Sequence, residues 1–114
     1  MKILYYHPNH VHSGGISNEW IYGIDLIYIL MKLYPKWDFV KMKANSKLKL
    51  RKMYATSDCL LRPSRHDGYS FGVQEALHFG LPVLHTYPIP GVILIESNLK
   101  SIETELLKLW LEVK

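Results

Sequence analysis

The chain has 114 residues, of which 48% are hydrophobic and 21% charged, and its formal net charge is +4. This length leaves room for one domain with one core and excludes two full domains, while the composition excludes an intrinsically disordered chain. We therefore expect a single domain over residues 1–114. The lone cysteine, Cys59, excludes an internal disulfide, and its apolar neighbours predict a position in the core.

The apolar runs are too short to serve as a signal peptide or a membrane span. The first, residues 3–6, is followed by no small-residue cleavage site, and the longest, residues 20–34, is interrupted by Asp25 and Lys32. We expect a soluble, cytoplasmic protein.

The first third of the chain predicts a strand, a loop and a long helix. Residues 3–6 are strand formers that end at a proline and an asparagine, and a glycine pair marks the following loop, residues 10–15. Ser17 or Asn18 can cap a helix over residues 18–33. Apolar residues cover most of that helix, so we expect it to be buried on more than one side.

The middle of the chain predicts a second strand and a short basic helix. Residues 37–42 alternate as a strand does, and residues 45–55 predict the helix. The inward contacts of this helix are expected to be Leu48, Met53 and Tyr54.

The last half predicts three strands and two helices. Residues 58–62 form an apolar strand, residues 71–79 a helix that ends at Gly80, and residues 82–85 another strand. Residues 92–95 predict a short fifth strand. A helix over residues 101–113 has Ser101 as its expected cap and an apolar face made of Ile102, Leu106, Leu109 and Val113.

Strands that alternate with helices indicate an α/β fold. We expect a single Rossmann-like domain with an open, mostly parallel sheet of four to five strands and helices on both faces. Ligands of such sheets bind beyond the carboxyl ends of the strands. The loops over residues 10–15 and 64–70 both follow strands, which predicts that both lie at this edge.

The loop after the third strand has a carboxylate on each side. Asp67 and Glu75 stand eight residues apart around Gly68, Ser70 and Gly72. The free backbone N–H groups at the start of a helix attract anions such as phosphate, and carboxylates accept hydrogen bonds from paired hydroxyls. The pattern therefore fits a nucleoside diphosphate sugar. It also fits a purely structural interpretation, in which Asp67 shapes a turn with Gly68 and Glu75 is a helix-surface charge.

The segment YATSDCLLRPSRHDGYSFGVQEALHFGLPVL resembles the donor-binding signature of retaining glycosyltransferases with the GT-B fold, especially the large family 4. The similarity extends over residues 54–83. The matching positions include Asp58, Pro63, Ser64, Gly68, Glu75, Ala76, Gly80, Pro82 and Val83.

The resemblance implies roles for residues and a reaction. Glu75 corresponds to the family's second glutamate, which binds the donor ribose, and Asp67 stands where the family's first glutamate contacts the transferred sugar and takes part in catalysis. The backbone around Ser70 and Gly72 corresponds to the loop near the donor phosphates. The implied reaction transfers a hexose from a nucleoside diphosphate sugar to an unidentified acceptor.

Two departures from the family pattern bear on this reaction. Aspartate at position 67 is one methylene shorter than glutamate, and residues 7–20 contain neither the arginine nor the lysine that neutralises the pyrophosphate in the family. The family enzymes have two such domains, so we expect the acceptor half to come from a partner chain or from a second copy in a homodimer. The alternative is a non-catalytic nucleotide-sugar-binding or interaction module.

Other polar residues lie in the two loops at the ligand edge. Further donor contacts are expected from Gly14, Gly15, Arg65, His66 and Phe71. His7, His10 and His12 can ligate a metal or act as hydrogen-bonding loop residues, and since no cysteine or acidic partner lies nearby in sequence, we expect no metal and no cofactor. His85, at the end of a strand, is either a ligand contact or a structural histidine.

Six cations stand within residues 41–52: Lys41, Lys43, Lys47, Lys49, Arg51 and Lys52. Such a cluster is either a solvated helix face or a surface for the phosphates of nucleic acid or lipid head groups. The chain has no nucleic-acid-binding motif, so we expect no nucleic-acid partner. A membrane surface is a further alternative partner, both for this basic cluster and for Trp110, near the end of the last helix.

Overall fold

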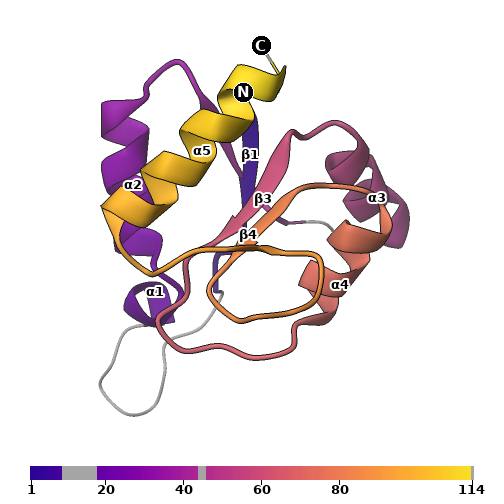
Figure 1. The fold of residues 1–114 in the computed structure, drawn as a ribbon. Coiled ribbons are helices and arrows are strands. Elements are labelled where there is room, and N and C mark those ends of the chain that lie inside the picture. Colours follow the sequence, from indigo (N-terminus) through magenta and orange to yellow (C-terminus); the bar gives the residue numbers. More distant parts are fainter. Residues whose placement is uncertain (9–17, 44–45, 114) are drawn as a thin grey trace.

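The computed structural model describes residues 1–8, 18–43 and 46–113, and these form an α/β domain (Figure 1). Five strands make one sheet in which every pairing is parallel, in the order β2-β1-β3-β4-β5. The strands are β1 (Lys2–Tyr5), β2 (Asp38–Lys41), β3 (Cys59–Arg62), β4 (Val83–His85) and β5 (Ile93–Leu94). The helices are α1 (Asn18–Ile21), α2 (Ile24–Leu33), α3 (Lys47–Ala55), α4 (Phe71–His78) and α5 (Leu99–Val113).

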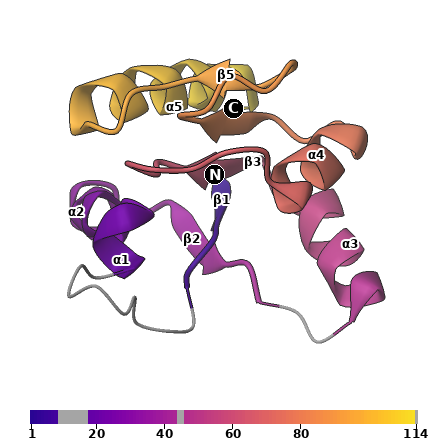
Figure 2. The ribbon, with the colours of Figure 1, turned by 90° about the horizontal axis from the view of Figure 1, so that it is seen from below.

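Helices cover both faces of the sheet, as the sequence predicts. Figure 2 shows α1 and α2 on one side of the strands and α3 and α4 on the other. Alternate strand residues point to opposite faces: Ile3 packs in the cluster with α2 and α5, whereas Leu4 packs in the cluster with α3 and α4. Cys59 is fully buried in the first cluster, and burial raises the pKa of its thiol to about 12. The fold is therefore Rossmann-like and doubly wound.

The predicted helix over residues 18–33 is wrong in one respect, because it is two helices. Gly23 lies between α1 and α2 with a φ of 71°, a left-handed conformation that side-chain-bearing residues rarely adopt. A Cβ at this position would stand 2.1 Å from the backbone oxygen of Pro63. Only glycine lets the chain pass this close to the end of β3, and the helix breaks there.

Helix α3 presents a different face to the sheet than the sequence suggested. Leu48, expected inward, is 78% exposed, whereas Leu50 is partly buried and packs with Met53 against the core. Tyr54 is buried as expected. Residues 50, 53 and 54 share one face at three- to four-residue spacing, and Leu48 stands on the opposite face.

The ends of α4 and α5 confirm one predicted cap and correct another. Gly80 has a φ of 77°, and the N–H groups of Gly80 and Leu81 donate to the carbonyls of Leu77 and Ala76, which closes α4 as predicted. The cap of α5 is Asn98 rather than Ser101, since Asn98 Oδ1 accepts the Ser101 N–H at 2.8 Å.

The far end of α5 also differs from its predicted face. Ile102, Leu106 and Leu109 are buried, but Val113, the last residue of α5, is 47% exposed. No helix in the described ranges is both long and apolar enough to cross a bilayer.

Candidate functional site

The strand order defines the place where a ligand is expected. β1 and β3 are neighbours in the sheet, yet the chain leaves β1 toward α1 and α2 on one face and leaves β3 toward α4 on the other. The connections thus diverge, and in open α/β sheets ligands bind outside the carboxyl ends of the strands at such a switch point. The loop over residues 63–70, which contains Asp67, begins there.

The amino-terminal end of α4 supplies the anion-attracting part of this edge. Ser70 is the N-cap, and its hydroxyl accepts the Val73 N–H at 3.4 Å. The first N–H groups of a helix have no intrahelical acceptor, and those of Phe71 and Gly72 have none among the described residues, so they can meet a ligand. Gly68 opens onto free space, since a Cβ built there meets no atom within 4 Å.

Asp67 is engaged by the protein itself. Its carboxylate accepts hydrogen bonds from Arg62 Nε at 2.5 Å, from the Ser64 hydroxyl at 2.8 Å and from the Gly68 N–H at 2.8 Å. The side chains of Arg62 and Asp67 are only 10% and 11% exposed. Burial raises the pKa of Asp67, but the hydrogen bond and charge of Arg62 outweigh burial and hold the pKa below its ordinary value. This carboxylate is ionised and turned inward.

Arg62 is a component of this edge that the sequence analysis did not select. Its guanidinium lies over the rings of Tyr6 and Tyr22, 4.9 Å and 5.3 Å from their centroids. Arg62 is the last residue of β3, so this cation lies at the carboxyl end of the strand, nine residues before the start of α4. A signal was present in the sequence, because an arginine that ends an apolar strand must find a partner if it is buried, and Asp67 follows five residues later.

Arg65, expected to contact the donor, faces the break between α1 and α2. Its guanidinium makes a two-pronged ion pair with Asp25 (2.7 and 2.8 Å) and donates to the Trp20 carbonyl at 2.6 Å. It also covers the Trp20 ring at 4.5 Å. The hydrogen bond from Arg65 holds the pKa of Asp25 below its ordinary value. Arg65 thereby connects the loop after β3 to the residues on either side of Gly23, between α1 and α2.

Glu75 belongs to α4, in the second turn after its start at Phe71. It is partly exposed on α4, and its charge acts on Tyr54 of α3. Burial and this charge raise the pKa of Tyr54 to about 12. The Tyr54 hydroxyl is buried and has no hydrogen-bond partner among the described residues. Of the two predicted carboxylates, that of Glu75 makes no ion pair and no side-chain hydrogen bond with the described residues.

The remaining predicted residues fall into three groups. Phe71 and His66 are exposed, Phe71 by 89%. His85 is fully buried, with its ring nitrogens 3.4 Å from the carbonyls of Arg62 and Gly68, so it is a structural histidine beneath the loop. The residues of the loop after β1 lie outside the described residues: Gly14, Gly15, His10 and His12.

The described residues contain no group of three or more side chains suited to hold a metal. The Nε2 atom of His7, the member of the histidine cluster that is described, lies 2.7 Å from a carboxylate oxygen of Glu19.

The predicted donor residues do not all converge on one place. Gly68, Ser70, Phe71 and Gly72 lie at or just before the start of α4, whereas Arg65 and Asp67 are paired with Asp25 and Arg62.

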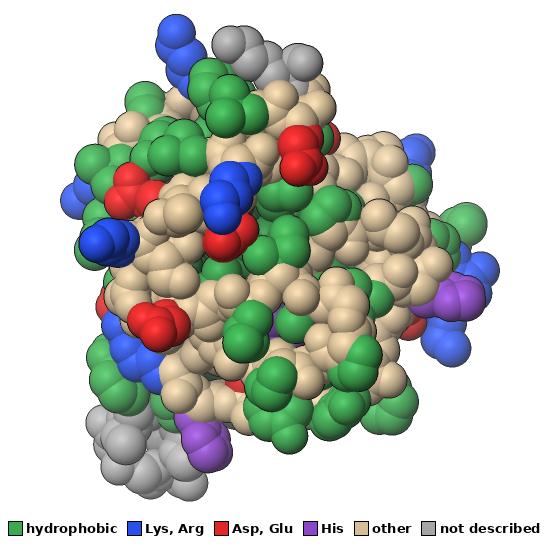
Figure 3. Space-filling view, in the orientation of Figure 1, with side chains coloured by type: hydrophobic (Ala, Val, Ile, Leu, Met, Phe, Trp, Pro, Cys, Tyr) green, Lys and Arg blue, Asp and Glu red, His purple; other side chains and the backbone are tan. Residues whose placement is uncertain are grey.

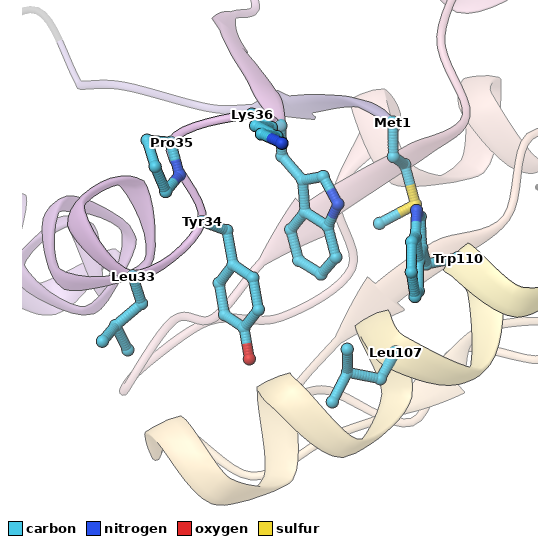
Figure 4. A pocket seen from close by; sticks show the side chains of 8 residues that line it. Met1, Leu33, Tyr34, Pro35, Lys36, Leu107 and Trp110 are labelled. Atoms are coloured by element: carbon cyan, nitrogen blue, oxygen red, sulfur yellow. The ribbon is translucent and has the colours of Figure 1, made fainter.

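A separate apolar cavity of about 490 Å³ opens at the other end of the strands (Figure 4). It lies at the amino-terminal edge, since Met1 precedes β1 and Trp37 precedes β2. Tyr34 and Trp37 stack with their centroids 4.2 Å apart. The cavity is lined by Met1, Leu33, Tyr34, Pro35, Lys36, Trp37, Leu107 and Trp110. The cavity lies away from the carboxyl ends of the strands, where the donor is predicted to bind. None of the described residues indicates which ligand would occupy it.

Comparison of the chain with protein-family models, with curated proteins and with solved structures finds no match. The resemblance to the donor-binding signature therefore rests on residues 54–83 alone.

Proposed function

We propose that this chain binds a nucleoside diphosphate sugar at the carboxyl edge between β1 and β3. The observation that carries the proposal is the start of α4 directly beyond the switch point, with the amides of Phe71 and Gly72 unused by the helix. Gly68 leaves open space beside them. The diphosphate takes the amides, and Glu75 accepts hydrogen bonds from the ribose hydroxyls.

The positive charge of Arg62 also supports this proposal. The pyrophosphate cations of the resembling family are missing from residues 7–20, and Arg62 supplies a positive charge at the same edge of the sheet. Asp67 balances much of this charge. We therefore expect moderate affinity that depends chiefly on the α4 amides and on Glu75.

The geometry of Asp67 favours binding without transfer by this chain alone. A carboxylate that already accepts from Arg62, Ser64 and the Gly68 amide has little capacity left to hold the hydroxyls of a sugar. Hexose transfer would require the Arg62–Asp67 pair to open and an acceptor half from a partner chain or a second copy. Binding is accordingly our first proposal, and transfer is the second.

Thermal-shift and calorimetric titration with UDP-, GDP- and ADP-sugars tests the binding proposal. We expect at least one of them to stabilise the chain in a saturable manner, and Glu75→Ala to weaken that binding about tenfold or more, as the loss of hydrogen bonds to a charged group does. Gln74→Ala, at an exposed position on the same helix, is the matched control and should bind as the parent does.

Two results would refute the proposal. One is the absence of stabilisation by every nucleotide sugar, and the other is equal binding by the Glu75→Ala and Gln74→Ala variants. Release of free sugar or transfer to an added acceptor, measured in the same samples, would favour the second proposal over the first.

A further inference from the structure

The outer face of α3 carries a cluster of charges that the described chain does not neutralise. We call Lys47, Leu48, Lys49, Arg51 and Lys52 the α3 basic surface; all five side chains are exposed. Figure 3 shows Lys and Arg side chains projecting on the side of the molecule where α3 and α4 lie. In the described ranges, none of these four cations makes a side-chain hydrogen bond or ion pair.

The sequence before α3 extends this positive charge. Lys41 and Lys43 precede the helix, and both are exposed. Between Asp38 and Asp58 the chain contains no acidic residue. The positive field over α3 is therefore not balanced by neighbours in sequence, and at moderate ionic strength it reaches about 10 Å into solvent.

An aliphatic side chain stands in the middle of these cations. Leu48 is 78% exposed between Lys47 and Lys49, in the first turn of α3, where the chain has just left the carboxyl end of β2. The inward side of the helix is already filled by Leu50, Met53 and Tyr54, so Leu48 has no place in the core. A single exposed leucine is common on proteins, but this one shares its face with Arg51 and Lys52.

We propose that the α3 basic surface docks on the surface of a membrane that contains anionic lipids. The cations would meet the lipid head groups, and Leu48 would enter the boundary between head groups and acyl chains. Interfacial helices place cations at the head groups and apolar side chains below them, and in α3 Leu48 is the apolar side chain on the outer face. Clusters of four to eight basic residues on such a helix bind anionic lipid.

The leucine distinguishes a membrane from a nucleic acid as the partner. Both present phosphates, and both would attract the lysines and the arginine. Nucleic acid offers its bases to aromatic side chains that stack, whereas α3 presents an aliphatic residue on its outer face. Of these two partners, only the membrane offers an apolar region that removes the leucine from water, so the combination of leucine and cations favours the membrane.

Vesicle co-flotation tests this proposal with phosphatidylcholine vesicles and with equimolar phosphatidylcholine and phosphatidylserine vesicles. We expect binding to the anionic vesicles only, and a large loss when salt rises from about 0.1 M to about 1 M. Lys47→Gln with Lys49→Gln should lower the partition coefficient roughly tenfold or more, since each cation contributes about fivefold. Leu48→Gln, which keeps every charge, should lower it roughly threefold to tenfold.

Matched variants on the opposite face serve as controls. Lys32→Gln with Lys100→Gln removes the same charge, and Leu111→Gln removes a leucine that is 67% exposed on α5. These variants should bind the vesicles as the parent does, and all variants should unfold at the parent's temperature because none of the changed side chains is buried.

Several outcomes would overturn the proposal. They are no flotation with anionic vesicles, equal flotation with neutral vesicles, and equal losses for the control variants. Tighter binding to a single-stranded oligonucleotide than to the vesicles, unchanged by Leu48→Gln, would identify a nucleic-acid surface instead. The proposal does not rest on nucleotide-sugar binding, since the α3 variants should leave that titration unchanged.

Discussion

The charges behind the β3 loop and the charges on α3 differ in how they are balanced. Arg62 and Asp67 are about nine-tenths buried and satisfy each other. The cations of the α3 basic surface are exposed and have no partner among the described residues. A buried charge without its partner destabilises the fold, whereas an exposed unpaired charge contributes little to stability and stays available for binding. Variants in the first region should therefore change folding, and those in the second should change only association.

The strongest test of the β3 loop is Gly23→Ala. The added Cβ would clash with the Pro63 carbonyl, and the left-handed backbone would be strained, so we expect a loss of about 4 kcal/mol in the free energy of unfolding. Urea denaturation measures it. Gly68→Ala, which adds a methyl group in open space, is the matched control and should change stability by less than about 1 kcal/mol. Equal stability of the two variants would show that the loop does not rest on Gly23.

Asp67→Asn should cost about 3 kcal/mol near neutral pH, because Arg62 would keep its charge in a buried site. Asp38→Asn, at an exposed position on β2, is the control and should be nearly neutral.

The pH dependence of this effect has a definite sign. The pKa of Asp67 is lower in the folded chain than its ordinary value near 4, so its contribution is complete above that value and is lost as the pH falls through the folded pKa. The free energies of unfolding of the parent and of Asp67→Asn should thus differ most above pH about 5 and become nearly equal in acid. A difference in the free energy of unfolding that stays the same at every pH would show that Arg62 does not stabilise the charged form of Asp67.

Tyr54→Phe should have a smaller effect of the opposite sign. Removing a buried hydroxyl that has no partner should raise the free energy of unfolding by up to about 1 kcal/mol. A clear loss of stability in thermal denaturation would mean that the hydroxyl is bonded. Tyr69→Phe, at a position that is 63% exposed, provides the comparison and should leave stability unchanged.

Much of the fold was predictable from local patterns. The alternation of apolar strands and amphipathic helices predicted the order of the elements and the parallel sheet, and Gly80 predicted the end of α4. Local patterns could not predict the break at Gly23, because its cause is the approach of Pro63, forty residues away in sequence. The face of α3 was missed for a related reason, since Leu48 and Leu50 are chemically equal and only the packing against α4 and the sheet separates them.

The position of the loop that carries the candidate site was predictable, whereas the partners of its side chains were not. The loop over residues 63–70 follows β3 at the switch point, as expected. The partners of Asp67 and Arg65 depend on distances across the fold, and a carboxylate expected to face a sugar is therefore found with Arg62. Whether Glu75 binds ribose remains a prediction.

The most direct test of nucleotide-sugar binding is the backbone amide NMR spectrum of the chain during titration with the nucleotide sugar that gives the largest thermal shift. We predict saturable shifts of the Ser70, Phe71 and Gly72 amides, with little change along α5. Shifts centred on the cavity beside Trp37 and Trp110, or no saturable shifts at all, would contradict the account.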